Sequence, residues 1–219
     1  MSLDFEVARF NMVEQQIRPW DVLDARVLHA CTEVPRELFV PAAYRNLAFT
    51  DTSIAIGHDQ HMMQPKVEAR LLQALAVQPT DRILEIGTGS GYLTALLATL
   101  GAHVTSIEYY EDLAQRAKEN LRHAGIGNIK LHVGDALDGW PTAEPYDVIA
   151  VTGSCPARRV AIEQQLGIGG RLFMVLGQAP VMEATLVTRL SKDSWTTEGL
   201  FETELAPLIG AEARPEFEF

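Results

Sequence analysis

Hydrophobic residues in the middle of the chain come in short blocks separated by longer amphipathic segments. The block from Ile83 to Ile86 is apolar and β-branched, as in a fully buried parallel strand. Further strand-like blocks lie at 103–107, 129–133, 147–151 and 171–176, and helical segments between them lie at about 92–100, 111–124 and 158–166. This alternation predicts an α/β fold with a doubly wound, Rossmann-like and mostly parallel sheet.

The pattern changes near the C-terminal end. Residues 183–191 and 195–203 alternate between apolar and polar positions, and Lys192-Asp193-Ser194 separates the two segments as a turn. Strict alternation is typical of strands with one buried face. We therefore predict a terminal antiparallel hairpin at the edge of the sheet.

The first sixty residues have a different character again. Helical spacing of Val7, Phe10, Val13 and Ile17 predicts a helix over 5–17 with these residues on its inner face. Asp21 or Asp24 is expected to cap a second helix that runs to residue 30. Because this segment lacks a core of its own, we interpret 1–64 as a helical and loop-rich cap on 65–219, the two forming one unit.

Three glycines follow the first strand of the alternating region. Gly87, Gly89 and Gly91 allow a ligand close to the backbone, and the next helix begins at this turn with free N–H groups. A dinucleotide fingerprint would need a further glycine at position 92, which is Tyr92, so that motif does not match. The turn predicts a nucleotide-type cofactor other than a dinucleotide.

Two carboxylates identify this cofactor further. Glu85 precedes the first glycine, and Glu108 ends the next strand, where Rossmann-like folds place the acceptor for a ribose diol. Carboxylates favour a cofactor with positive charge, and S-adenosylmethionine has a sulfonium, an ammonium and no phosphate. Asp135 is expected either to accept the adenine amino group or to stabilise a turn. The predicted cofactor-binding residues are Glu85, Gly87, Thr88, Gly89, Gly91, Glu108, Asp135 and Ala136.

Composition limits the partners and the compartment. The net charge of −11 argues against nucleic acid or an anionic membrane as the main partner. Cys31 and Cys155 are far apart and have no ligand spacing, so we expect reduced thiols in a cytoplasmic protein. The chain shows neither an apolar run of transmembrane length nor a signal-peptide pattern. Its oligomeric state does not follow from these features.

A polar segment with two histidines, Gly57 to Pro65, precedes a helix predicted over 66–76. We interpret it as a loop. His58, Asp59 and His61 are candidate metal ligands, but three ligands within four residues rarely converge on one ion, so no metal is expected. At least one of Met62 and Met63 is expected to fill a gap in the core.

With these motifs, most of the chain resembles the protein-L-isoaspartate O-methyltransferase family, a class I methyltransferase family. The resemblance implies a sheet with a reversed last strand and S-adenosylmethionine as the methyl donor. It also implies an acceptor, the isoaspartyl carboxylate of damaged proteins or peptides, which is methylated so that it can cyclise and be repaired. The motifs are Val34-Pro35-Arg36-Glu37-Leu38-Phe39-Val40-Pro41, Ile56-Gly57-His58 with Gln60 and Gln64-Pro65, Leu84-Glu85-Ile86-Gly87-Thr88-Gly89-Ser90-Gly91-Tyr92, and Gly169-Gly170-Arg171-Leu172.

The acceptor side departs from the family pattern. The family loop reads Gly-His-Gly-Gln-Thr-Ile-Ser before Gln-Pro, and here Asp59 replaces a glycine, His61 the threonine and Met63 the serine. Two further family segments become Ser154-Cys155 and Glu204-Leu205-Ala206-Pro207-Leu208. If Asp59 and Glu204 ionise near the acceptor, they would repel a carboxylate.

These departures leave three hypotheses. The first is isoaspartyl methylation in protein repair. The second is methylation of a different, neutral acceptor, such as a small-molecule hydroxyl, phenol or amine, with His61 or His58 as the base and Asp59 orienting it. The third is a catalytically inactive cofactor-binding protein. The candidate catalytic positions are His61, Asp59, His58 and Met63, and the candidate substrate-side residues are Gln60, Gln64, Pro65, Ser154 and Ala206.

Overall fold

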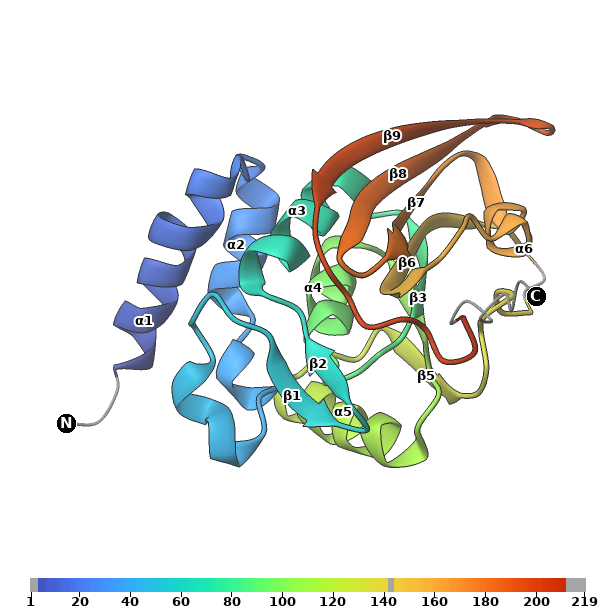
Figure 1. The fold of residues 1–219 in the computed structure, drawn as a ribbon. Helices are drawn as coiled ribbons and strands as arrows, with labels where there is room; N and C mark the ends of the chain where they lie inside the picture. Colours follow the sequence, from blue (N-terminus) through green and yellow to red (C-terminus); the bar gives the residue numbers. More distant parts are fainter. Residues whose placement is uncertain (1–3, 142–143, 212–219) are drawn as a thin grey trace, which may run out of the picture.

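A seven-stranded sheet forms the centre of the computed structural model, which describes residues 4–141 and 144–211 (Figure 1). The strand order is β5-β4-β3-β6-β7-β8-β9, and the first five of these strands are parallel. β8 runs antiparallel to β7, and β9 antiparallel to β8. The strands are β3 (Arg82–Ile86), β4 (His103–Glu108), β5 (Ile129–Val133), β6 (Tyr146–Cys155), β7 (Leu166–Gln178), β8 (Val181–Ser191) and β9 (Ser194–Glu202).

This architecture confirms the predicted fold class and the terminal hairpin. One detail differs, because the strand that runs against the others is β8, the penultimate strand, and not the last one. α3 (Pro65–Leu75), α4 (Tyr92–Leu100) and α5 (Glu111–His123) lie close to their predicted ranges. α6 (Val160–Glu163) is shorter than predicted, since the chain enters β7 already at Leu166.

The N-terminal segment differs from its prediction in which face is buried. α1 covers only Phe5–Met12 and continues into a π-helical turn, Val13–Ile17. Val7 is 55% exposed and Phe10 63% exposed, whereas the side chains of the π-helical turn at Val13 and Ile17 are buried. A π-turn holds more residues than an α-turn and so rotates the buried face relative to the residues before it. The predicted inner face is therefore wrong for its first half.

The start of α2 (Ala25–Glu33) decides between the two predicted caps. The carboxylate of Asp24 accepts a hydrogen bond from the backbone N–H of Arg26 at 2.8 Å, which is the expected geometry of an N-cap. Asp21 instead ends a short 3₁₀ turn with a left-handed backbone conformation. Asp24 is the helix cap.

Most of the segment from Gly57 to Pro65, which was interpreted as a loop, belongs to a β-hairpin that begins at Ile54. β1 (Ile54–Gly57) pairs antiparallel with β2 (Gln60–Met62). His58 and Asp59 form the turn, with positive φ angles of 53° and 56°. Two-residue hairpin turns need this conformation, and Asn-Gly or Asp-Gly is its usual sequence signal. His-Asp lacks that signal, which is why the sequence did not reveal the hairpin.

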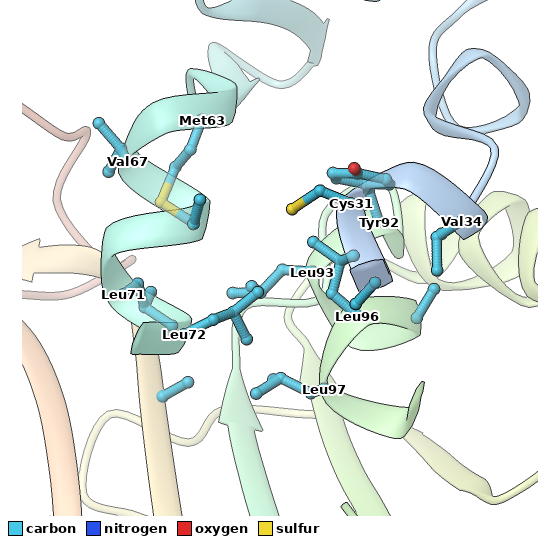
Figure 2. Packing of buried hydrophobic residues seen from close by; sticks show 14 of the residues in the cluster. Cys31, Val34, Met63, Val67, Leu71, Leu72, Tyr92, Leu93, Leu96 and Leu97 are labelled. Atoms are coloured by element: carbon cyan, nitrogen blue, oxygen red, sulfur yellow. The ribbon is translucent and has the colours of Figure 1, made fainter. Parts of the chain in front are cut away.

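The N-terminal segment shares its core with the helices beside the sheet. Figure 2 shows Cys31 of α2, Leu72 of α3, and Leu96 of α4 among the buried side chains that meet there. Phe39 packs edge-on against Tyr92, with 5.6 Å between the ring centroids. The division of the chain at residue 64 stays a prediction. Both cysteines, Cys31 and Cys155, are buried and free. Among the described residues, no helix is long and apolar enough to cross a membrane.

Candidate functional site

A cleft opens at the carboxyl ends of the parallel strands. It encloses about 860 Å³ of empty space, part of it open to solvent. Its floor and walls come from the residues that follow β3, β4 and β5 and from the end of β6, which is where open α/β sheets bind ligands. The β1–β2 hairpin and residues 207–209 complete the walls.

The glycine turn after β3 leaves no room for a side chain at its first position. Gly87 has a φ of +97°, and a Cβ added to it would lie 2.2 Å from the hydroxyl oxygen of Thr152. That hydroxyl donates a hydrogen bond to the Gly87 carbonyl at 2.7 Å, which ties the turn to β6. Gly91, with a φ of +87°, is the N-cap of α4. The turn therefore brings bare backbone to the cleft surface.

Glu108 lies at the end of β4 and lines the cleft. Its Oε2 accepts the backbone N–H of Gly89 at 2.8 Å, and its Oε1 accepts the backbone N–H of Tyr110 at 3.0 Å. The side chain is 5% exposed. One carboxylate thus fixes the glycine turn and presents negative charge to a ligand.

Glu85 lies beneath the surface of the cleft, although the sequence predicted a contact with the ligand. It is fully buried and does not line the cleft, and its Oε2 accepts hydrogen bonds from the hydroxyls of Thr94 and Ser106, both at 2.5 Å. The Ser106 hydroxyl is also 2.5 Å from that of Thr88, which lines the cleft. Burial raises the pKa of Glu85 to about 8, although these two hydrogen bonds oppose the shift. A role for Glu85 in cofactor binding stays a prediction, and its geometry allows it to act only from beneath the surface.

Asp135 and Ala136 follow β5 and line the cleft. The Oδ1 of Asp135 accepts the backbone N–H of Leu137 at 2.9 Å, so the turn that the sequence offered as one alternative is present. Its Oδ2 accepts no hydrogen bond from the described part of the chain. That oxygen is therefore available to an amino group in the cleft.

The hairpin divides the candidate catalytic residues. His61 and Met63 line the cleft together with Gln60, whereas His58 and Asp59 do not. The ring of His58 stacks on Tyr110 with 4.0 Å between centroids, and its Nε2 lies 2.8 Å from Oδ1 of Asp112. The partner of His58 is thus Asp112 and not Asp59, which corrects the expectation that Asp59 orients His58.

Met63 has become part of the core as well as of the cleft wall. It is 7% exposed, and Figure 2 shows its side chain beside Val67 at the start of α3. Its backbone carbonyl accepts a hydrogen bond from Nη2 of Arg36 at 2.7 Å.

The other substrate-side candidates support the cleft without lining it. Gln64 precedes α3 and Pro65 is its first residue. Ser154 is buried, and its hydroxyl donates to the carbonyl of Leu205 at 3.0 Å. The backbone N–H of Ser154 donates to the carbonyl of Ala206 at 2.9 Å, a bond that brings 207–209 to the cleft. Glu204 is exposed and outside the lining.

Several lining residues were not identified from the sequence. Tyr109 and Tyr110 follow Glu108 directly, and Leu137 follows Ala136, so their place after a strand end was a usable signal. Glu68 also lines the cleft from within α3. It lies inside an ordinary helical pattern, and nothing in that pattern distinguishes it.

The charge of the lining fits a cationic ligand. Glu68, Glu108 and Asp135 are its acidic residues, and among the described residues that line the cleft there is no lysine or arginine. Phosphate groups are normally held by such cations, so the lining disfavours a dinucleotide. A sulfonium and an ammonium fit it well. In the described part of the chain, no cluster of three or more His, Cys, Asp or Glu side chains is arranged to hold a metal ion.

Comparisons of sequence point to one family. The profile of the family described as protein-L-isoaspartate(D-aspartate) O-methyltransferase matches residues 8–213. A protein-L-isoaspartate O-methyltransferase from Rhodopseudomonas palustris is 41% identical over 202 residues, which are 92% of this chain and 93% of the relative. One from Methanoculleus marisnigri is 46% identical over 169 residues, which are 77% of each chain.

Solved structures agree on the fold. A Plasmodium falciparum structure of the same description, in complex with S-adenosyl-L-homocysteine, superimposes with a TM-score of 0.80 at 19% identity, over 94% of this chain and 99% of that one. A second protein-L-isoaspartate O-methyltransferase superimposes with a TM-score of 0.77 at 26% identity, over 91% of this chain and 65% of that one. Since the profile and the relatives cover almost the whole sequence, this chain belongs to the protein-L-isoaspartate(D-aspartate) O-methyltransferase family.

Proposed function

We propose that this protein transfers the methyl group of S-adenosylmethionine to the free carboxylate of isoaspartyl residues in proteins and peptides. The observation that carries the proposal is the family match over residues 8–213, which includes every segment that lines the cleft. S-adenosylmethionine is the methyl donor of this family. The acidic lining, with no lysine or arginine among its described residues, supports the same donor independently of the match.

Two acidic side chains of the cleft lining have roles in binding the methyl donor. We infer that Glu108 accepts the ribose hydroxyls and that Oδ2 of Asp135 accepts the adenine amino group, which their positions on the cleft lining support. Tyr109 and Leu137 add apolar surface to the same cleft lining. When bound, the cofactor supplies an electrophilic methyl group. The residues of the chain orient it and keep its surroundings dry, which is a large part of catalysis in an in-line transfer.

The acceptor side needs donors and no base, because a carboxylate is already ionised at neutral pH. His61 and Gln60 border the cleft and carry side-chain N–H groups. Within the described residues, the side-chain amide of Gln60 donates only to the carbonyl of His58, at 3.2 Å, a bond that an acceptor carboxylate can replace. We infer that these two side chains hold the acceptor in place of the family's hydroxyls.

The argument for a neutral acceptor loses its main support. It required Asp59 and Glu204 near the reacting carboxylate, but both are exposed and outside the lining. Solvent weakens the repulsion that such exposed charges exert on a carboxylate in the cleft. An anionic acceptor is therefore compatible with this cleft.

A paired peptide assay tests the proposal. The protein is incubated with S-adenosylmethionine and either a peptide containing one isoaspartyl residue or the same peptide with aspartate. The expected product is a methyl ester on the isoaspartyl peptide alone, detected as a mass increase that is lost in mild base. If the protein binds S-adenosyl-L-homocysteine by calorimetry yet esterifies neither peptide, the isoaspartyl proposal fails and a different acceptor must be sought.

We also propose that residues 1–64 act as a cap over the cleft of 65–219. This is supported by the hairpin, whose Ile56 and Gln60 line the cleft. A cytoplasmic location is proposed as well, and the two buried free thiols are consistent with it.

A further inference from the structure

Glu68 is a buried carboxylate on the cleft wall that none of the roles above uses. It lies in α3, it is 3% exposed, and it lines the cleft. Its Oε2 accepts a hydrogen bond from Nη1 of Arg36. Its Oε1 accepts no hydrogen bond from any described residue, and it is not among the buried atoms that lack a partner. Oε1 is therefore the oxygen that faces the cleft.

Arg36 cannot turn into the cleft itself. Its side chain is completely buried, and besides Glu68 it donates from Nη2 to the carbonyl of Met63 at 2.7 Å and from Nε to the carbonyl of Ala48 at 2.9 Å. Its guanidinium lies 4.5 Å from the ring centroid of Tyr92. Every nitrogen of Arg36 is engaged, so the charge that this pair presents to a ligand is the carboxylate of Glu68.

The position of Glu68 in the fold separates it from the other two acids of the lining. Glu108 and Asp135 follow β4 and β5, on one side of β3. α3 packs against β7, which lies on the other side of β3. Glu68 therefore reaches the cleft from an element on the opposite side of β3 from the two acids that are proposed to hold the adenosine.

We propose that Glu68 binds the ammonium group of the cofactor's amino-acid moiety, and that Arg36 is a positioning residue that fixes its carboxylate. This inference rests on the cofactor of the proposed function and is independent of the methyl acceptor. An ammonium presents three N–H donors and a full positive charge, which match an acceptor oxygen on a wall that has no lysine or arginine among its described residues.

The electrostatics of the site support this assignment. Burial raises the pKa of Glu68 to about 7, even though Arg36 lowers it. The single arginine does not fully offset the cost of burying the ionised carboxylate. A second cation in contact with Glu68 would therefore stabilise its ionised form.

Truncated ligands test the proposal by calorimetry, without any methyl transfer. S-adenosyl-L-homocysteine carries the amino-acid moiety, 5′-methylthioadenosine lacks it, and decarboxylated S-adenosylhomocysteine keeps the ammonium but lacks the carboxylate. Glu68→Gln is expected to weaken binding of the first and third ligands about tenfold, the effect of losing one charge-assisted hydrogen bond. Its effect on 5′-methylthioadenosine should stay below about twofold, within the scatter of a remote change.

Glu163→Gln is a matched control. Glu163 is also 3% exposed and paired with an arginine, Arg158, at 2.6 and 2.7 Å, but it does not line the cleft. This variant should leave the affinities for all three ligands unchanged. An equal loss for all three ligands in Glu68→Gln would overturn the proposal, because it would indicate general disruption of the cleft.

A second variant keeps the test decisive if the unpaired Arg36 prevents Glu68→Gln from folding. The double change of Arg36→Met with Glu68→Leu removes both charges and leaves an apolar pair, a replacement that buried ion pairs often tolerate. The folded double variant should show the same selective loss, and unchanged affinity for S-adenosyl-L-homocysteine would overturn the proposal. Selective loss in a protein that fails to esterify isoaspartyl peptides would refute the proposed acceptor and leave the role of Glu68 standing.

Discussion

The carboxylate of Glu108 accepts the backbone N–H of Gly89 at 2.8 Å, so the side chain expected to bind the cofactor also shapes the turn beneath it. Glu108→Ala removes both functions. We expect it to weaken the affinity for S-adenosyl-L-homocysteine by roughly 1–3 kcal/mol, through the loss of charge-assisted hydrogen bonds. Titration calorimetry measures this directly.

Glu111→Ala provides the control for that change. Glu111 is exposed in the first turn of α5, and it does not line the cleft. Its replacement should not alter the affinity. If Glu108→Ala also binds S-adenosyl-L-homocysteine as tightly as the unmodified protein, Glu108 has no place in the cofactor site.

The donor half of the site could be predicted from sequence because its signals are local. The strand, the glycine turn and the acid at the next strand end occupy fixed places relative to one another in this fold, and Gly87, Gly89 and Glu108 all line the cleft. That they bind the cofactor stays a prediction. Glu85 is the instructive exception, since its direction depends on Thr94 and Ser106, which come from other elements. Spacing along one strand does not report such contacts.

The acceptor half of the site depends on tertiary packing and was therefore harder to predict from the sequence. The hairpin turn at His58 and Asp59 has no sequence signal, and Asp59 lies outside the cleft lining. Glu68 lies in an ordinary amphipathic helix, and only its pairing with Arg36, 32 residues earlier, places a carboxylate on the wall. Such pairs are set by how distant segments meet.

Replacing Glu85 should change how stability depends on pH. The pKa of Glu85 is about 8 in the folded protein, against an ordinary value of 4.5, mainly because of burial. Between these values the folded state keeps a proton that the unfolded chain releases, so this group lowers the free energy of unfolding as the pH rises through that range. We expect Glu85→Gln to remove this decline, which amounts to a few kcal/mol.

Urea denaturation at pH 5, 6.5 and 8 checks this expectation. The pKa of Glu68 is also raised, to about 7, so this residue too lowers the free energy of unfolding as the pH rises. The test is therefore the difference between the pH profiles of the variant and of the unmodified protein. Glu119→Gln, at an exposed position of α5, is the control and should keep the original profile. Identical profiles for Glu85→Gln and the unmodified protein would contradict the assignment.

Gly87→Ala should damage the fold and the cleft together. The new Cβ would lie 2.2 Å from the Thr152 hydroxyl, and the φ of +97° is strained for any L side chain. Together these effects should cost roughly 1–3 kcal/mol of stability. Gly127→Ala is the matched control, because a Cβ there meets nothing within 4 Å and its φ is not positive. Equal denaturation midpoints for the two variants would show that the turn can relax.

Asp59→Gly separates the two views of the acceptor loop. Asp59 has a φ of 56° in the hairpin turn and lies outside the cleft lining. Glycine adopts this conformation without strain, so the variant should be as stable as the unmodified protein or more so, by up to about 1 kcal/mol. Its rate on an isoaspartyl peptide should not change. A marked rise in that rate would show that the Asp59 carboxylate does repel the acceptor.

Replacing His61, unlike replacing Asp59, should weaken binding of the methyl acceptor. It lines the cleft, and its ring N–H can hold a carboxylate where the family has a threonine hydroxyl. We expect His61→Ala to raise the KM for an isoaspartyl peptide about tenfold, as one hydrogen bond to a charged group is lost. His61→Thr should recover part of this loss.

The affinity for S-adenosyl-L-homocysteine should be the same in both variants, because no donor-side contact changes. If His61→Ala instead lowers kcat with KM unchanged, and the rate falls most on a neutral acceptor, then His61 acts as a base and the protein methylates a different class of substrate.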